Sequence, residues 1–200
     1  MNLLFEEETK KARRRQLLKE SGYFLIAAVL VILLAWLIVH FALKKASMIG
    51  SSMQTTLYNG EDLIVNRTSY KLFSPKRGAV IAFYPETDEN EEHTDSSILV
   101  RRVVGLPGEQ VQIKDGLIYI NGEPLSEKYK FDPIESAGRA LEPVTLEKNE
   151  YFVMSDKRDD LDDSRSTSFT KVYKKQIIGK VVFSLNPFAL IGGPKEEGEQ

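Results

Sequence analysis

The first feature of this sequence that could do chemistry is a pair of serines, Ser51 and Ser52, that follows a glycine. It lies in the stretch Gly50-Ser51-Ser52-Met53. Glycine permits an unusual backbone and lets a substrate chain approach closely. A serine hydroxyl becomes a nucleophile when a neighbouring base takes its proton. Such a stretch on its own is more often an ordinary turn, so it indicates catalysis only together with other features.

Two later stretches carry clustered charges. Residues 101–109 (RRVVGLPGE) read as a strand that ends in a glycine-proline turn, and the simplest interpretation is a strand with exposed arginines. Residues 155–165 (SDKRDDLDDSR) combine carboxylates with guanidinium groups, which can form ion pairs that brace a loop. Carboxylate clusters also bind calcium, but this spacing lacks the calcium-loop pattern and its closing glutamate. We therefore expect no metal site in this stretch.

The composition argues against several other chemistries. The chain has 200 residues, no cysteine and only two histidines, His40 and His93. It has no thiol nucleophile and too few histidines for a metal cluster, and we expect no cofactor. The formal net charge of -2 gives no reason to expect nucleic acid as a partner.

One segment is apolar enough to cross a membrane. Residues 23–43 carry no formal charge apart from the titratable His40. At about 1.5 Å per residue they span about 30 Å, the thickness of a hydrocarbon core. A cleavable signal peptide would have a shorter apolar stretch followed by small residues, whereas Lys44 and Lys45 follow here. We interpret the segment as a retained transmembrane helix, with the lipid bilayer as a partner.

The cations around this segment predict its orientation. Two lysines follow it, and six cations precede it: Lys10, Lys11, Arg13, Arg14, Arg15 and Lys19. Because lysine and arginine accumulate on the cytoplasmic side, we expect a single-pass plasma-membrane protein with a cytoplasmic N-terminus and an extracytoplasmic main domain. The expected organisation is a basic tail at 1–22, the span at 23–43, a β domain at 44–193 and a polar tail at 194–200.

The sequence after the span has the pattern of a β domain. Short apolar runs between turn residues predict strands at 63–65, 79–84, 98–104, 111–113, 117–120, 151–154 and 177–185. Asp115-Gly116 and Asn121-Gly122 predict tight turns, because such pairs readily adopt positive φ angles. The fold class is therefore mainly β, a β-barrel or β-sheet domain preceded by one transmembrane helix. The acidic stretch 86–97 reads as a solvated loop, so we expect no catalytic role for His93 within it.

Taken in order after a span, the charged stretches and the serine stretch resemble the boxes of type I signal peptidases, serine proteases that remove export signals. Residues 52–57 resemble the family's Ser-Met-x-Pro-Thr-Leu box. Residues 101–109 resemble its Lys-Arg-x-x-Gly-Leu-Pro-Gly-Asp/Glu box, and residues 155–165 its Gly-Asp-Asn-Arg-x-x-x-x-Asp-Ser-Arg box. The resemblance covers the span and nearly all of 44–193, and the short chain is similar to the single-span branch of Gram-positive type. It implies a signal-peptidase-like β domain, with precursor proteins that carry signal peptides as partners.

The resemblance also implies roles for individual residues. Ser52 takes the place of the nucleophile. The family uses a lysine of lowered pKa as the base, and backbone N–H groups near the serine stabilise the oxyanion. Oxyanion or substrate contacts are implied for Gly50, Ser51, Met53, Leu99 and Val100. Structural support is implied for Arg102, Asp156, Arg158, Asp163 and Arg165.

Arg101 occupies the position of the family's lysine. A guanidinium has a pKa above about 12 and is effectively never deprotonated in a protein. Arg101 therefore cannot act as the base, although it could orient Ser52 or stabilise an oxyanion. Leu161 stands where the family has the serine that orients the lysine amine, and Ser155 replaces a glycine. Lys157, which replaces an asparagine, is the candidate for a substitute base; its simpler interpretation is a solvent-exposed loop cation.

Three interpretations remain open at this point. The protein is an active peptidase in which another amine acts as the base, or a weak one in which Ser52 relies on solvent and on the oxyanion site. In the third, it is a silent homologue that assists the assembly of surface proteins such as pilins. The retained hydroxyl of Ser52 favours the first two. We predict a membrane-anchored serine endopeptidase of signal peptidase I type, with the assembly factor or chaperone as the alternative.

Overall fold

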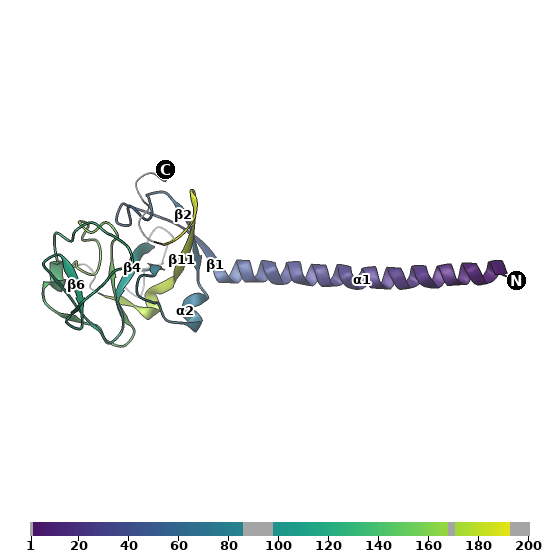
Figure 1. Cartoon of the computed structure of the whole chain (residues 1–200), viewed down its shortest axis with the longest axis horizontal. Helices are drawn as coiled ribbons and strands as arrows, with labels where there is room; N and C mark the ends of the chain where they lie inside the picture. Colours follow the sequence, from purple (N-terminus) through teal and green to yellow (C-terminus); the bar gives the residue numbers. More distant parts are fainter. Residues whose placement is uncertain (1, 86–97, 168–170, 193–200) are drawn as a thin grey trace, which may run out of the picture. The chain divides into compact units, whose positions relative to one another are not determined.

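The computed structural model describes residues 2–85, 98–167 and 171–192. The predicted acidic loop 86–97, with His93, and the predicted tail 194–200 lie outside the described residues. The chain divides into two compact units, a helix that ends at Ala42 and a β domain that begins at Leu43 (Figure 1).

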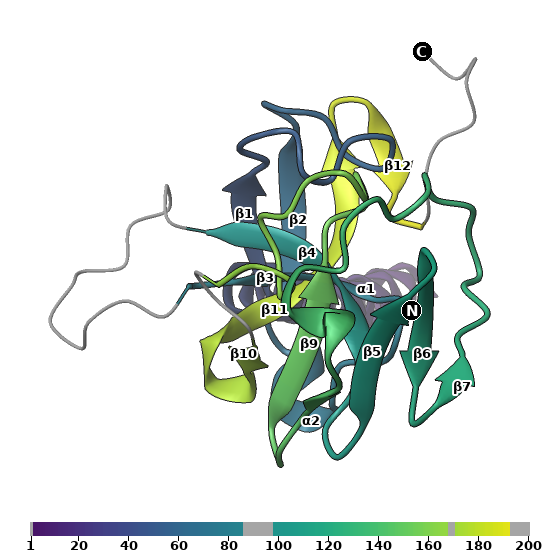
Figure 2. The ribbon, with the colours of Figure 1, turned by 90° about the vertical axis from the view of Figure 1, so that its left-hand side faces the viewer.

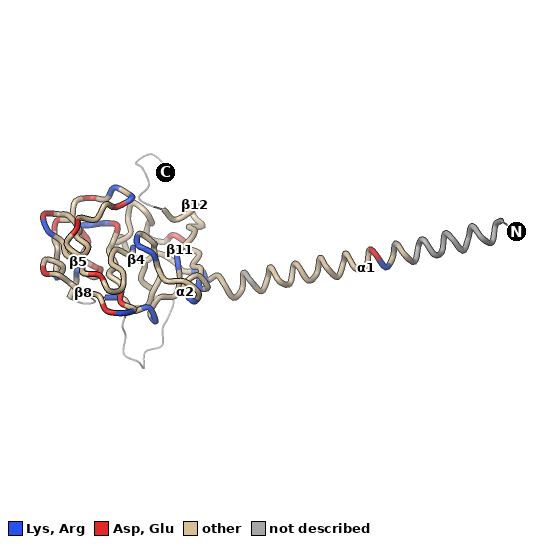
Figure 3. The backbone as a smooth tube through the Cα atoms, turned by 60° about the horizontal axis from the view of Figure 1, so that its bottom comes forward, with Lys and Arg blue, Asp and Glu red and all other residues tan. Residues whose placement is uncertain are grey.

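Helix α1, Asn2–Ala42, is continuous and runs through both the predicted tail and the predicted span. Its segment Leu18–Ala42 is long and apolar enough to cross a membrane, and none of it is buried within the protein. Between Ser21 and Ala42 the helix carries no Lys, Arg, Asp or Glu (Figure 3). Large side chains such as Phe24 and Trp36 are more than half exposed, at 77% and 58%. Apolar surface of this extent requires an apolar environment, and the predicted N-terminal apolar helix is confirmed.

The larger sheet of the β domain has eight strands, all of them in antiparallel pairs. They are β1 (Leu43–Ser47), β2 (Asp62–Asn66), β3 (Val80–Phe83), β4 (Leu99–Gly105), β9 (Glu150–Met154), β10 (Val172–Tyr173), β11 (Ile177–Leu185) and β12 (Phe188–Leu190). Their order is β1-β2-β11-β3-β4-β9-β10, and β12 pairs with β11. Strand β4 buries all of its residues except Leu99, and strand β9 buries all of its residues. Of the three predicted chemical stretches, residues 101–109 begin on β4 and residues 155–165 directly follow β9.

The smaller sheet lies beside β9 and has the order β7-β6-β5-β8 (Figure 2). Its strands are β5 (Gln110–Lys114), β6 (Leu117–Ile120), β7 (Glu123–Pro124) and β8 (Val144–Thr145). The turn residues Asp115, Gly116, Asn121 and Gly122 all have positive φ angles, of 50°, 74°, 52° and 86°. Both predicted tight turns are therefore confirmed.

Short helical turns connect the strands. They are α2 (Ser69–Leu72) and the 3-10 turns η2 (Gly138–Leu141) and η3 (Lys174–Gln176). All seven predicted strands are present as β2, β3, β4, β5, β6, β9 and β11, which confirms the mainly β fold class. Leu43, expected as the last residue of the span, is the first residue of β1.

Gly105 joins the two sheets at the end of β4. A Cβ atom added there would lie 2.5 Å from Cγ2 of Val111 and 2.9 Å from Cβ of Phe152. Carbon atoms do not approach so closely, so a glycine is required where β5 and β9 close on β4. The first glycine of the Gly-Leu-Pro-Gly-Glu stretch is thus explained by packing.

Candidate active site

Ser52 lies in the loop between β1 and β2, and only 4% of its surface is exposed. The loop is closed at its base, because the N–H of Met48 donates to the carbonyl of Glu61 at 2.8 Å. Gly50 adopts a φ of 85°, and its N–H donates to Oδ1 of Asn59 at 3.0 Å. Met53, directly after Ser52, is completely buried. Ser52 is therefore held between a closed loop base and an anchored methionine.

Arg101 projects from β4 into the interior and is only 1% exposed. Its Nε and Nη2 donate to the carbonyl and to Oδ2 of Asp162, at 2.6 and 2.5 Å, and its Nη1 donates to the carbonyl of Val100 at 2.6 Å. Burial lowers the pKa of Arg101, while the neighbouring carboxylates, Asp162 first, act to raise it. Every one of these contacts uses the guanidinium as a donor, so it remains a cation. The interpretation of residues 101–109 as a strand with exposed arginines is wrong.

Arg102 ties the three predicted stretches together. Its Nε and Nη2 donate to the two carboxylate oxygens of Asp156 at 2.7 and 2.6 Å. Oγ1 of Thr56 donates to Oδ2 of the same carboxylate at 2.5 Å. Arg102 and Asp156 are 2% and 1% exposed. A bidentate guanidinium–carboxylate pair fixes both position and orientation, so the serine loop, β4 and loop 155–165 share one buried clamp.

A second buried ion pair shapes loop 155–165. Oδ2 of Asp163 accepts the backbone N–H of Ser155 at 2.8 Å and Nη2 of Arg165 at 2.7 Å. Arg165 also donates to the carbonyls of Arg158, at 2.7 Å, and of Asp160. Because the carboxylate and the guanidinium satisfy backbone groups as well as each other, the loop is closed upon itself.

Lys157 reaches Ser52 through its backbone. The N–H of Lys157 donates to the carbonyl of Ser52 at 3.0 Å. The amine lies 3.8 Å from Oδ2 of Asp159, and the lysine side chain is 37% exposed. The loop that carries Lys157 also carries Asp162, the partner of Arg101. The three predicted stretches therefore meet at one place, with Ser52, Lys157 and Arg101 on the segments that meet there.

The predicted substrate-binding residues do not all lie together. Met53 and Val100 belong to the same buried cluster. Leu99 packs against a different cluster, which contains Ile81 and Phe83. Successive residues of a strand face opposite sides of a sheet, so the two neighbours on β4 contribute to different faces.

Arg158 has a buried partner that sequence reasoning did not single out. Its Nη2 donates to Oε1 of Glu127 at 2.6 Å, and its Cζ lies 4.2 Å from the ring centroid of Phe131. Burial raises the pKa of Glu127, although Arg158 acts to lower it. Asp162 and Thr56 were also missed. The sequence indicates these partners only through the many carboxylates near the arginines. That excess does not show which carboxylate pairs with which arginine.

No metal ligand set accompanies this site. Among residues 2–85, 98–167 and 171–192, no group of three or more His, Cys, Asp or Glu side chains could hold a metal ion. The groups at the site that could do chemistry are the hydroxyl of Ser52, the nearby amine and guanidinium groups, and backbone N–H groups.

Comparisons with known proteins show to which family the chain belongs. Residues 21–186 match the family model described as signal peptidase, peptidase S26. Signal peptidase I T of Bacillus subtilis (strain 168) is 37% identical over 163 residues, which cover 78% of this chain and 80% of that protein. A signal peptidase I of Bacillus licheniformis is 36% identical over 163 residues, covering 78% and 83%. A crystal structure of a signal peptidase I from Enterococcus faecalis V583 is 29% identical, covers 54% of this chain and 97% of that one, and has a TM-score of 0.40.

The chain has an apolar N-terminal helix and a mainly β domain, and its relatives are signal peptidases. Together these features define a membrane-anchored serine endopeptidase. The chain belongs to the peptidase S26 family of signal peptidases. The comparisons do not favour the alternative of an assembly factor.

Proposed function

We propose that this protein removes signal peptides from exported precursor proteins, with Ser52 as the nucleophile. The N-terminus lies in the cytoplasm and the β domain lies outside the plasma membrane. Membership of the family supports the reaction, and one observation supports the site: the hydrogen bond from the N–H of Lys157 to the carbonyl of Ser52 at 3.0 Å. It brings a titratable amine onto the segment next to the serine.

Lys157 is the proton acceptor in this proposal. Its backbone is fixed beside Ser52, and a four-carbon stem lets the amine change rotamer toward the hydroxyl. The contact with Asp159, at 3.8 Å on a 37% exposed side chain, does not prevent this, because an exposed ion pair of this kind stabilises by at most about 1 kcal/mol. The amine must be neutral when it accepts the proton.

Arg101 has a positioning role in the same proposal. Its guanidinium donates to the carbonyl and the carboxylate of Asp162, and Asp162 lies on the loop that carries Lys157. Arg101 thus holds the loop and keeps a positive charge near the site. Backbone N–H groups of the serine loop stabilise the negative charge that develops on the carbonyl oxygen of the substrate.

The direct test uses the full chain in detergent and a precursor peptide with an Ala-x-Ala cleavage site. Wild type should give a single cleavage product, and Ser52→Ala should give none, because the substitution removes the nucleophile. Ser74→Ala, at an exposed serine that follows α2 and lies on none of the three stretches, is the matched control and should cleave like wild type. Identical product traces from wild type and Ser52→Ala would reject the proposal.

A further inference from the structure

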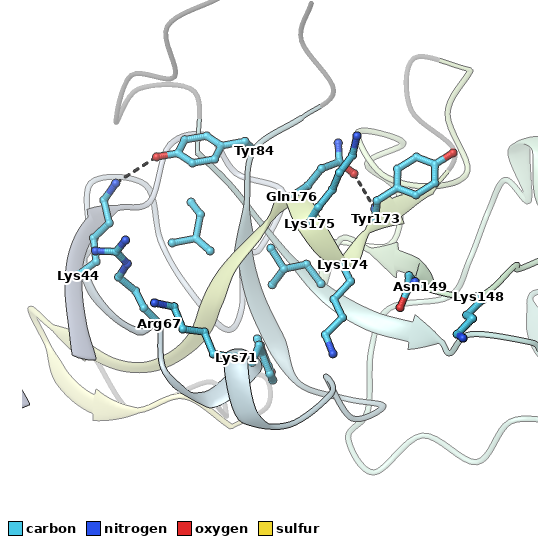
Figure 4. Close-up of a pocket in the computed structure, with 13 residues that line it drawn as sticks. Lys44, Arg67, Lys71, Tyr84, Lys148, Asn149, Tyr173, Lys174, Lys175 and Gln176 are labelled. Carbon is cyan, nitrogen blue, oxygen red and sulfur yellow. Dashed lines mark hydrogen bonds between the residues drawn. The ribbon is translucent and has the colours of Figure 1, made fainter. Parts of the chain in front are cut away.

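A basic pocket opens on the β domain at the start of β11, next to α2 and the beginning of β1. It has a volume of about 720 Å³ and is lined by 13 residues (Figure 4). Six of them are cations: Lys44, Arg67, Lys71, Lys148, Lys174 and Lys175. None of the lining residues is an Asp or a Glu. Three tyrosines, two isoleucines (Ile177 and Ile178), Asn149 and Gln176 complete the lining.

Most of these cations are not neutralised by the protein. Within the described parts of the chain, Arg67, Lys71, Lys148 and Lys175 form no ion pair with a carboxylate. Like charges gathered around one cavity repel each other and create a positive potential that attracts an anion. The buried hydroxyl of Tyr70, in the same lining, has no hydrogen-bond partner among the described residues, so one donor there is also unused.

The strands position two of the cations at one end of the pocket. Lys44 pairs with Val65 in the register of β1 and β2, and Arg67 follows β2 directly. A Cβ atom on Gly179 would lie 2.3 Å from the carbonyl oxygen of Asn66 and 3.0 Å from Cα of Arg67. A glycine at 179 therefore lets the backbone of Arg67 lie against β11. Lys44, Arg67 and Lys71 appear together at one side of the pocket in Figure 4.

The pocket is separate from the candidate active site. The serine loop leaves β1 after Ser47, which pairs with Asp62, whereas Lys44 pairs with Val65 near the other end of the same two strands. The lining of the pocket includes neither Ser52 nor any residue of loop 155–165. A ligand in this pocket would therefore not occupy the position of the reacting serine.

We propose that the basic pocket binds the phosphate of an anionic phospholipid headgroup. Lys44 follows Ala42, the last residue of the apolar helix, by two positions, so it lies at most about 7 Å from the helix end along the chain. The headgroup layer extends about 5 to 8 Å beyond the hydrocarbon core, so Lys44 falls within reach of that layer. The volume of about 720 Å³ suits a small organic ligand and exceeds the need of a bare phosphate ion. The side chains of Ile177 and Ile178 in the lining suit the glycerol and upper acyl carbons.

The experiment is a lipid titration of the full chain in a neutral detergent, followed by native mass spectrometry. Phosphatidylglycerol and phosphatidylcholine with the same acyl chains are compared. Phosphatidylglycerol should bind more tightly, because only its headgroup carries a net negative charge. Arg67→Gln/Lys71→Gln should weaken its binding about thirtyfold, since each cation near an anionic surface contributes about fivefold.

Matched variants separate the pocket from the general charge of the domain. Lys114→Gln/Lys130→Gln removes the same charge at exposed sites outside the pocket and should bind phosphatidylglycerol like wild type. Lys148→Gln/Lys175→Gln, a second pair from the lining, should also weaken binding. Thermal unfolding midpoints equal to wild type show that the variants are folded.

Three results would overturn the proposal. The first is equal binding of the two lipids, and the second is an equal loss in the pocket and control variants. The third is a competitor, inorganic phosphate or an acidic decapeptide, that binds more tightly than phosphatidylglycerol, which would assign the pocket to free phosphate or to a peptide. Preserved cleavage of a soluble precursor peptide by the pocket variants would show that the proposed reaction stands independently.

Discussion

Proton transfer at Ser52 depends on a side chain that is neutral at the moment of attack. Arg101 does not meet this need, because its guanidinium is 1% exposed and donates to Asp162 and Val100. In the proposed mechanism Lys157 takes this role, because an amine, unlike a guanidinium, can lose its proton, and the backbone N–H of Lys157 donates to the carbonyl of Ser52. At the scale of single residues, the base and the fixed cation are therefore expected to be different side chains.

Replacing Lys157 tests this division. Lys157→Ala should lower kcat by about 10²- to 10⁴-fold, the usual contribution of a general base. Alanine keeps the N–H that donates to Ser52, so the backbone should remain in place. Lys157→Arg is the matched control: it retains the positive charge but cannot deprotonate, so it should lose as much activity. Initial rates of peptide cleavage measure both, and full activity of either variant would contradict the assignment.

Restoring the family's residues at positions 101 and 161 is the complementary test. In Arg101→Lys/Leu161→Ser, a buried lysine with a lowered pKa and a nearby hydroxyl should raise kcat at least tenfold over wild type. Arg101→Met/Leu161→Ser is the control, because it has the hydroxyl but no amine, and it should show no gain. If the lysine variant gains nothing while wild type cleaves well, a base elsewhere is already sufficient.

The sequence named candidate residues for the site more readily than it named their partners. Ser52, Arg102, Asp156 and Asp163 could be named because ordered motifs place them. Asp162 could not, because five carboxylates share loop 155–165 and only the folded loop determines which one faces Arg101. Pair formation between segments far apart in the chain is a property of packing, which composition does not report.

At the scale of elements, the clamp of Arg102, Asp156 and Thr56 should determine whether the serine loop, β4 and loop 155–165 stay together. Asp156→Ala leaves the guanidinium of Arg102 buried without its carboxylate. Removing one partner of a buried ion pair costs about 3–5 kcal/mol, so the free energy of unfolding should fall by that amount. Urea unfolding of the full chain in detergent, followed by far-UV circular dichroism, measures the change.

The control for this prediction comes from the same loop. The side chain of Asp159 is 52% exposed, and its Oδ2 lies 3.8 Å from the amine of Lys157. Asp159→Ala should therefore change the free energy of unfolding by less than about 0.5 kcal/mol. If Asp156→Ala and Asp159→Ala lowered the free energy of unfolding equally, the buried clamp would stabilise the domain no more than an exposed contact does.

Strands with an apolar core and a turn motif were predictable, and strands defined only by pairing were not. The hairpin of β5 and β6 follows from Asp115-Gly116. Strand β1 (LKKAS) has two lysines and one buried residue, Ala46, so its sequence lacks the alternation of a strand. It is extended because it pairs with β2 over five residues. The two-residue strands β7, β8 and β10 are likewise too short for a sequence pattern.

At the scale of the whole molecule, the proposed orientation can be tested because the chain has no cysteine. A single cysteine can be introduced at the exposed Lys114, in the β domain, or at the exposed Gln16, before the span. In intact cells a membrane-impermeant maleimide should label Lys114→Cys, whereas it should label Gln16→Cys only after lysis. Labelling of Gln16→Cys in intact cells would contradict a cytoplasmic N-terminus.

Strand β1 has one further consequence, because it is the outermost strand of the large sheet and, among the residues that the structure describes, it pairs with β2 alone. Proteins confined to a membrane meet one another often, and open strand edges invite sheet-to-sheet aggregation. Lys44 and Lys45 lie on β1, and lysines on an edge strand are one of the devices that disfavour such pairing. We therefore expect two copies of the chain to resist pairing through their β1 edges.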